Sequence, residues 1–256
     1  MQTTRKPTSN WLLTVSRKMV LCATLAAAVT GSWLASSASA AMIDLTGSIT
    51  NPSFETPALV DGAYTGTITG WLTYTDHGNG FAIVSNPDTN AYSSGSPADG
   101  SNMLAINAQA DFALGFVVYQ DIPVTLLPGT IYTLTVAIGN RIGGHATDTF
   151  KIELDKHDSA LNSNSSLARY DGLGSDLTAD SWTNKTISYT ATAADAGKTL
   201  TIFLGVDTAA KTYSQVTDFD NVRLTSAPIP EPGTITLLAA GLLACAWRRR
   251  RSACQP

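Results

Sequence analysis

The residues best able to do chemistry in this chain are its carboxylates. Residues 41–227 carry 19 acidic and eight basic side chains, a net charge of −11, and every acid in this range except Glu55 and Glu153 is aspartate. Carboxylate oxygens are the hard ligands that Ca²⁺ takes in proteins, although an acidic surface equally serves solubility. The same charge argues against nucleic acid as a partner, because phosphates are bound by Lys and Arg.

Other residue types with catalytic potential form no recognisable site. The histidines His77, His145 and His157 are scattered, whereas a zinc site needs more ligands than this spacing supplies. No spacing predicts the carboxylate pair of a glycosidase, and no Gly-x-Ser-x-Gly or phosphate-binding glycine motif is present. The glycine-rich run 139–145 follows a predicted strand without a helix after it, so we interpret it as a turn. The sequence therefore predicts a protein that is not an enzyme.

The elements that must position these residues are predicted to be strands. Short runs rich in Val, Ile, Thr, Tyr and Phe recur between Gly, Pro, Asn, Asp and Ser, and apolar and polar residues alternate along 131–139, as in a strand with one buried face. No amphipathic helix of useful length is evident. We expect an all-β domain, a two-sheet antiparallel jelly-roll sandwich. The clearest predicted strands are 102–108, 115–122, 131–139, 149–154, 183–192, 199–206 and 219–225.

Both ends of the chain are expected to be processing segments. At the N-terminus, basic residues precede an apolar run over 19–35, and Ala38-Ser39-Ala40 is a small-x-small cleavage site. We therefore expect residues 1–40 to be a signal peptide cut after Ala40. All three cysteines, Cys22, Cys245 and Cys254, lie in the end segments. The exported domain, residues 41–227, should fold in an oxidising compartment without disulfides.

The C-terminal residues 228–256 have three parts: Pro230-Glu231-Pro232, an apolar stretch over 234–247, and the cluster Arg248, Arg249, Arg250 and Arg251. The stretch is shorter than the ~20 residues that span a bilayer comfortably, and the arginines place the exported domain outside. An ordinary anchor helix has these features, but their order resembles the PEP-CTERM sorting signal of Gram-negative bacteria. That resemblance implies an exosortase partner, transient residence of a single transmembrane helix in the inner membrane, and delivery to the cell surface or extracellular matrix.

A second resemblance rests on six short motifs in a fixed order across the exported domain. They are Asn51-Pro52-Ser53-Phe54-Glu55, Gly70-Trp71, Asp99-Gly100-Ser101-Asn102, Tyr119-Gln120, Pro128-Gly129 and Phe219-Asp220-Asn221-Val222. The set resembles carbohydrate-binding-module-like, galactose-binding-type jelly rolls. In that family the first and last strands lie side by side, and many members hold a structural calcium ion at their junction.

The resemblance implies particular ligands for such an ion. Glu55 and Asp220 match the side-chain ligands, with Asn51 and Asn102 as further contributors. Ca²⁺ takes six to eight oxygens, which a junction of two strands can supply together with backbone carbonyls. Without a metal, the same two carboxylates would cap backbone N–H groups at the sheet ends.

The resemblance also implies a sugar-binding face, because pyranose rings stack on exposed aromatic side chains. Tyr74, Tyr92 and Tyr170 lie in polar, loop-like sequence and are the expected contacts with polysaccharide. Trp71 and Trp182 are further candidates, although such positions commonly pack inside sandwiches. The main expectation is therefore an exported, exosortase-processed surface or biofilm-matrix protein, a non-catalytic glycan-binding module with calcium.

Two alternatives remain at this stage. One is a purely structural matrix component with no defined ligand. The other is a calcium-dependent enzyme, because the same jelly roll resembles the Stig cyclases of cyanobacterial indole-alkaloid biosynthesis. That resemblance implies an aspartate acid in an aromatic pocket, and Asp218 lies near the matching position. Asp218 is otherwise interpreted as a solvated charge at a strand edge.

Overall fold

The computed structural model describes residues 41–74, 80–108, 116–144, 146–157, 166–206 and 215–229, together with Gly241. Residues 40–229 form one compact unit. Within the described part of the chain no helix is long and apolar enough to span a membrane. Several predicted features lie outside the described residues: the signal cleavage residues Ala38 and Ala40, the sorting residues Pro230, Glu231 and Pro232, and the cluster Arg248, Arg249, Arg250 and Arg251.

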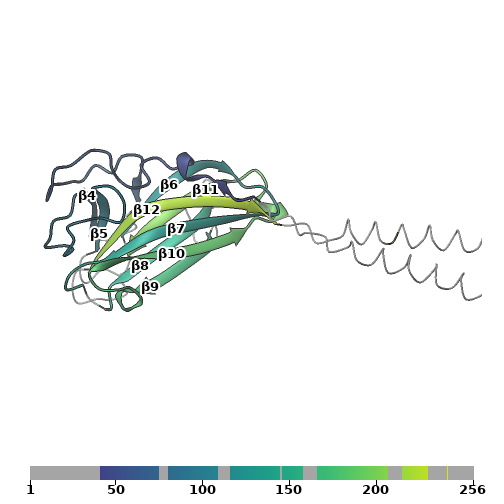
Figure 1. The fold of residues 1–256 in the computed structure, drawn as a ribbon. Coiled ribbons are helices and arrows are strands. Elements are labelled where there is room, and N and C mark those ends of the chain that lie inside the picture. Colours follow the sequence, from purple (N-terminus) through teal and green to yellow (C-terminus); the bar gives the residue numbers. More distant parts are fainter. Residues whose placement is uncertain are drawn as a thin grey trace, which may run out of the picture. The chain divides into compact units, whose positions relative to one another are not determined.

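The unit is a sandwich of two antiparallel sheets, which confirms the predicted all-β class (Figure 1). One sheet has seven strands in the order β10-β7-β12-β5-β4-β2, with β1 also paired to β12. Its strands are β1 (Ile43–Asp44), β2 (Tyr64–Thr65), β4 (Gly80–Ser85), β5 (Met103–Ala108), β7 (Thr130–Asn140), β10 (Ser181–Thr190) and β12 (Gln215–Pro228).

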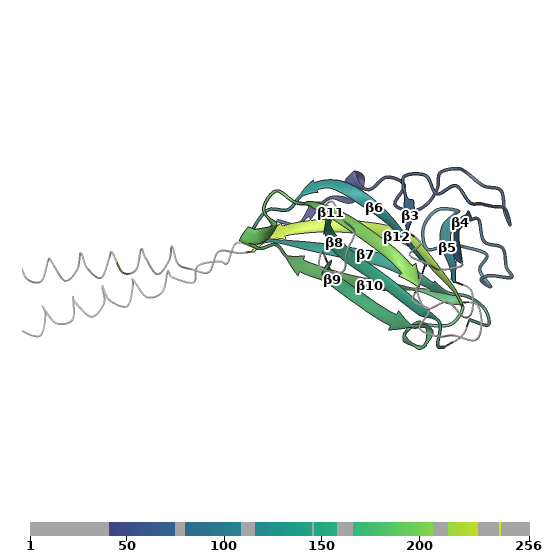
Figure 2. The ribbon, with the colours of Figure 1, turned by 180° about the vertical axis from the view of Figure 1, so that it is seen from behind.

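The second sheet has five strands in the order β3-β6-β11-β8-β9, several of which are labelled in the reverse view of Figure 2. They are β3 (Leu72–Tyr74), β6 (Phe116–Thr125), β8 (Thr149–His157), β9 (Ser166–Leu173) and β11 (Thr199–Val206). Three 3-10 turns complete the described elements: η1 (Thr46–Ser48), η2 (Gly174–Asp176) and η3 (Ala193–Asp195).

The core lies between the two sheets, and β7 shows why it forms. Tyr132, Leu134, Val136 and Ile138 are all buried, while Thr133 and Thr135 face outward and exchange hydroxyl hydrogen bonds with β10. Alternation of this kind buries one face of a strand and leaves the other polar. The pattern breaks toward the end of β7 and in β5, where nearly every residue is buried. A second layer must therefore cover the outer face of the seven-stranded sheet in this region.

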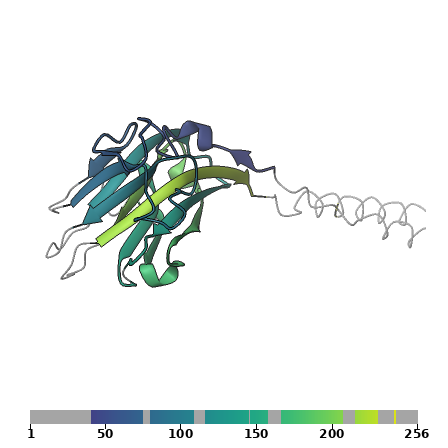
Figure 3. The ribbon, with the colours of Figure 1, turned by 60° about the vertical axis from the view of Figure 1, so that its left-hand side comes forward.

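The start of the domain lies along its last strand, as Figure 3 shows for the first described segment beside the end of β12. Ile43 is opposite Ser226 in this pairing. The N–H of Leu45 donates to the carbonyl of Leu224 at 2.8 Å, and the N–H of Val222 donates to the carbonyl of Pro52 at 2.9 Å. The segment that precedes Glu55 is therefore held against β12, close to Asp220.

Candidate functional site

Two carboxylates of β12, Asp218 and Asp220, are the centre of the candidate site. Phe219, between them, is fully buried in the core, so its two neighbours point to the outer face of the seven-stranded sheet. Both aspartates are nevertheless 0 % exposed. Their cover is the connection between β4 and β5, because its residues Tyr92 and Asp99 bond to Asp218 and Asp220 respectively.

A glycine in β7 makes room for this cover. Trp182, Gly139, Asp218 and Ala105 are opposite one another in four adjacent strands and form one row across the sheet. A Cβ at position 139 would collide with the Tyr92 hydroxyl and the Trp182 ring. Because Gly139 has no side chain, the Tyr92 hydroxyl can reach Asp218.

Asp218 is held by three hydrogen bonds. The Tyr92 hydroxyl donates to Oδ2 at 2.7 Å, and Arg141 donates from Nε to Oδ2 at 2.7 Å and from Nη2 to Oδ1 at 2.8 Å. The Tyr92 ring stacks on Trp182 with centroids 5.1 Å apart. Trp182 is fixed in turn by a bond from its Nε1 to the carbonyl of Ser96 at 3.2 Å. The result is a buried carboxylate between a guanidinium and an aromatic pair.

The charges of this group follow from burial and pairing. Burial, followed by the negative charge of Asp218, raises the pKa of Tyr92, so its hydroxyl stays protonated and donates. Burial alone would lower the pKa of Arg141, but the charge and hydrogen bonds of Asp218 outweigh it and raise the pKa. The Arg141 side chain is 31 % exposed and separates Asp218 from solvent on that side. The sequence had suggested a solvated charge at position 218, whereas this carboxylate is buried and ion-paired.

A second cluster surrounds Asp220. Its Oδ2 accepts from the N–H of Asp99 at 2.7 Å and its Oδ1 from the N–H of Asn221 at 2.6 Å. Glu55 Oε1 accepts from the N–H groups of Ser101 and Asn102, at 2.9 and 2.8 Å. Both carboxylates therefore accept hydrogen bonds from the same connecting loop, Asp220 from Asp99 and Glu55 from Ser101 and Asn102.

Two features of this cluster leave negative or acceptor groups uncompensated. Burial raises the pKa of Asp220 to about 8, and the negative charges of Asp99 and Glu55 contribute, against the two backbone N–H bonds. The amide of Asn102 donates to the carbonyls of Phe54 and Pro57, but its buried Oδ1 accepts no hydrogen bond. Buried acceptors of this kind normally have a partner.

The cluster around Asp220 contains groups that suit a bound cation. An acceptor without a donor and a buried carboxylate near two others are groups that Ca²⁺ would satisfy. In the described part of the chain, however, no three Asp, Glu, His or Cys residues converge tightly enough to hold a metal by themselves. Amide and backbone oxygens would have to complete the site. The fourth predicted ligand, Asn51, closes its own turn by exchanging bonds with Thr56 at 2.9 and 3.0 Å.

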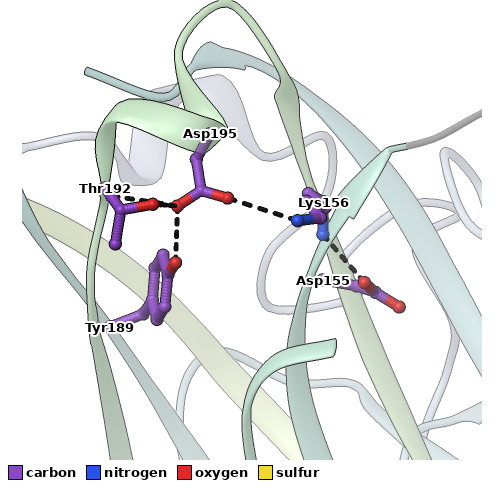
Figure 4. A network of polar contacts seen from close by, with 5 residues as sticks. All are labelled: Asp155, Lys156, Tyr189, Thr192 and Asp195. Atoms are coloured by element: carbon purple, nitrogen blue, oxygen red, sulfur yellow. Dashed lines mark hydrogen bonds and ion pairs between the residues drawn. The ribbon is translucent and has the colours of Figure 1, made fainter. Parts of the chain in front are cut away.

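A third polar network has a structural explanation (Figure 4). Asp195, at 2 % exposure, accepts from the hydroxyls of Tyr189 and Thr192 at 2.5 and 2.6 Å, and from Lys156 Nζ at 3.3 Å. Burial would raise the pKa of Asp195, but the Thr192 and Tyr189 bonds lower it. Asp195 also forms a capping box with Thr192 at the start of η3. Its oxygens are occupied in holding this turn between two strands.

The remaining aromatic candidates lie in different parts of the sandwich. Trp71 is buried, its ring 5.5 Å from that of Phe54. Tyr170 lies in β9 and stacks on core residue Phe150 at 5.8 Å. Tyr74, at the end of β3, is 37 % exposed. The five predicted ligand residues therefore form no common face, and only Tyr92 and Trp182 are brought together. Sugar binding by these residues stays a prediction.

Comparison with known proteins finds matches for the exported domain and for the C-terminal segment. Residues 46–225 match the family model of the HpiC1-like proteins, described as HpiC1 cyclase. Residues 228–251 match the PEP-CTERM protein-sorting motif, which confirms the predicted sorting signal and implies exosortase-mediated export in Gram-negative bacteria. No curated protein matches the chain significantly.

Among solved structures, the Stig cyclase Fisc from Fischerella sp. TAU, in complex with (3Z)-3-(1-methyl-2-pyrrolidinylidene)-3H-indole, is 26 % identical with a TM-score of 0.60. The match covers 73 % of this chain and 99 % of that one. A cyclase from Fischerella sp. TAU in complex with 4-(1H-indol-3-yl)butan-2-one is 27 % identical, covers 74 % and 98 %, and has a TM-score of 0.57. Arabinose-bound MgGH51 α-L-arabinofuranosidase, at 16 % identity, 72 % and 26 % coverage and a TM-score of 0.50, shares the fold alone.

These matches contradict the prediction that the protein is not an enzyme. The family model describes a cyclase, and the two Fischerella proteins, of which 99 % and 98 % are covered, are cyclases. The prediction was wrong because it relied on the absence of local catalytic motifs and gave the resemblance to the Stig cyclases too little weight. Here Asp218 meets Tyr92 and Arg141 only after folding, from positions 126 and 77 residues away.

Proposed function

The chain belongs to the HpiC1-like cyclase family, and we propose that its exported domain is a cyclase-type enzyme with Asp218 at its reaction centre. The observation that carries this proposal is the fully buried Asp218 carboxylate, hydrogen-bonded to Tyr92 and lying in one row with Trp182. A carboxyl group beside aromatic rings can donate and accept a proton, while the ring faces stabilise a developing cation.

The reaction class is an isomerisation: a proton adds to one carbon–carbon double bond of the substrate, the resulting cation takes the electron pair of a second π bond to form a new carbon–carbon bond, and loss of a proton restores that second π bond. Asp218 is the group that would deliver and recover the proton, because both its oxygens lie at the centre of the site. Tyr92 orients the carboxyl group through its 2.7 Å bond to Oδ2. The Trp182 ring, stacked on Tyr92, is the aromatic surface available to a cationic intermediate.

Arg141 sets a condition on this chemistry. Its two bonds to Asp218 hold that group as a carboxylate acceptor, and its side chain covers the carboxylate on the partly exposed side. Asp218 can take up a proton for transfer only when these bonds are released. We therefore place substrate entry on the Arg141 side, where a bound molecule would displace the guanidinium and reach Asp218 and Trp182.

We further propose a structural calcium ion bound by Glu55, Asp220 and the Oδ1 of Asn102. Support comes from the acceptor of Asn102 that has no hydrogen bond and from the raised pKa of Asp220. The ion would supply positive charge and fix the loop from Asp99 to Asn102 on β12. Because the same connection carries Tyr92, the calcium ligands would help to place Tyr92 on Asp218.

The test uses an indole, the class of molecule bound in the related cyclase structures. Binding of 4-(1H-indol-3-yl)butan-2-one should change tryptophan fluorescence in the full chain, and Trp182→Leu should remove most of that change. Turnover of a prenylated indole, followed by chromatography because isomerisation leaves the mass unchanged, should be lost in Asp218→Asn. Asp171→Asn, at a carboxylate 56 % exposed, is the matched control. Wild-type turnover by Asp218→Asn would refute the assignment.

A further inference from the structure

Four exposed, large apolar side chains lie near residues 41 and 229, the first and last described residues of the domain. Met42, Ile43, Leu127 and Ile229 are 73 %, 55 %, 60 % and 42 % exposed, and we call them the terminal apolar end. Ile43 pairs with β12 opposite Ser226, three residues before Ile229. The N–H of Ile229 donates at 2.8 Å to the carbonyl of residue 129, which belongs to the turn that contains Leu127. The four side chains therefore come from neighbouring segments.

The terminal apolar end is uncharged in a domain that is otherwise strongly acidic. The segments 41–43, 126–130 and 226–229 contain no charged residue, whereas residues 41–227 carry 19 acidic and eight basic side chains. The charged residues next to these segments in the sequence are Asp44, Arg223 and Glu231, and the carbonyl of Lys198 accepts from the N–H of Leu126. An apolar, uncharged patch on an acidic protein indicates an apolar partner.

The chain itself shows which partner is in reach. Residues 230–233 are all that separates Ile229 from the apolar stretch 234–247 of the sorting signal. Four extended residues span at most about 14 Å, which is less than half the ~30 Å hydrocarbon thickness of a bilayer. Whenever that stretch is in a membrane, Ile229 and its neighbours must lie close to the membrane surface.

We propose that the terminal apolar end is a membrane-docking surface, and that its partner is the outer leaflet of the inner membrane before the sorting signal is cut. Interfacial binding strengthens with the apolar area buried and does not need a charged headgroup. After cleavage only four side chains remain to hold the domain, and so small an apolar contact gives weak, reversible binding. Cleavage would thereby release the domain as well as cut the tether.

Fluorescent labelling of the full chain in lipid vesicles tests this surface. In a Cys22→Ser, Cys245→Ser, Cys254→Ser background, an environment-sensitive dye is attached at Leu127→Cys or, as control, at Val60→Cys. Val60 is 78 % exposed but lies near Asn86, beside β4. We expect a blue shift at position 127, and a loss of its emission with lipid-borne quenchers, but neither at position 60. Equal quenching at both positions, or none at 127, would overturn the proposal.

A longer linker distinguishes binding of the terminal apolar end to lipid from proximity that the short linker imposes. About 20 Gly and Ser residues inserted between Ile229 and Pro230 add a coil of roughly 25 Å. If the surface docks by itself, the quenching at position 127 persists in this variant. Substituting Ile43→Asp and Ile229→Asp in the long-tether protein should then abolish it, while thermal unfolding reports that the fold is intact. Loss of the signal on lengthening the tether alone would show that the surface has no affinity for lipid.

Discussion

Replacing Arg141 with Met tests the ion pair between Arg141 and the buried Asp218 at the centre of the candidate site. Asp218 is 0 % exposed and receives two of its three hydrogen bonds from Arg141, at 2.7 and 2.8 Å. Removing one partner of a buried ion pair costs about 3–5 kcal/mol, because an uncompensated charge remains. The Arg141 side chain is 31 % exposed, so water can reach the vacated space and we expect about 2–3 kcal/mol at pH 7. In a domain of this size that lowers Tm by roughly 5–10 °C.

The assay is thermal unfolding at pH 7. Arg169→Met is the matched control, because Arg169 pairs with Asp171 at the surface and such pairs contribute at most about 1 kcal/mol. The double variant Arg141→Met, Asp218→Asn should recover stability relative to Arg141→Met alone. A loss no larger than that of Arg169→Met, or no recovery in the double variant, would refute the reasoning.

Three further predictions concern the region around β12. Ca²⁺ at a hundredfold excess over its Kd should stabilise the protein by about 2.7 kcal/mol, and Glu55→Ala or Asp220→Ala should abolish that thermal shift. In chelator, the pKa of Asp220 of about 8 lies above its unfolded value of about 4, so stability is fully present below pH 4 and falls as the pH rises to 8. Urea unfolding should show this loss, at up to about 1.4 kcal/mol per pH unit, and Asp220→Asn should flatten it. Gly139→Ala should destabilise the folded protein by about 1–3 kcal/mol, because the added methyl group would overlap the Tyr92 hydroxyl. In a Tyr92→Phe background, which lacks that hydroxyl, the same substitution should cost less, and a double-mutant cycle measures the difference.

The architecture was predictable where burial imposes a period on the sequence. Alternation along 131–139 predicted β7 because one face of that strand packs in the core and the other is polar. β9 was not predicted, since Ser166–Leu173 mixes small, charged and apolar residues at an edge of the five-stranded sheet. The two- and three-residue strands β1, β2 and β3 are too short for any period to be visible.

The candidate site was predictable only in part, because it depends on contacts between distant segments. Motif order grouped Glu55 with Asp220, and in the structure both accept hydrogen bonds from the loop 99–102; it also drew attention to Asp218. Nothing local indicated that Arg141, in a run interpreted as a turn, would pair with Asp218. A single basic residue after a strand is a common surface feature, and its partner is fixed by the pairing of β7 with β12.

The two carboxylate clusters are coupled by the geometry of one strand and one loop. Asp218 and Asp220 are two residues apart in β12, a spacing of about 7 Å along one face. The connection between β4 and β5 lies over both, and it contributes Tyr92 to Asp218 and the Asp99 N–H to Asp220. A group that strengthens the bonding of Asp220 and Glu55 to this loop also limits the movement of Tyr92, because Tyr92 lies in the same connection between β4 and β5. Asn221 has a left-handed backbone conformation and the pairing of β12 with β7 shifts register after Asp220, so β12 is irregular directly beyond this cluster. The cluster of Asp220 and Glu55, where we propose calcium, therefore holds the loop that places Tyr92 on Asp218.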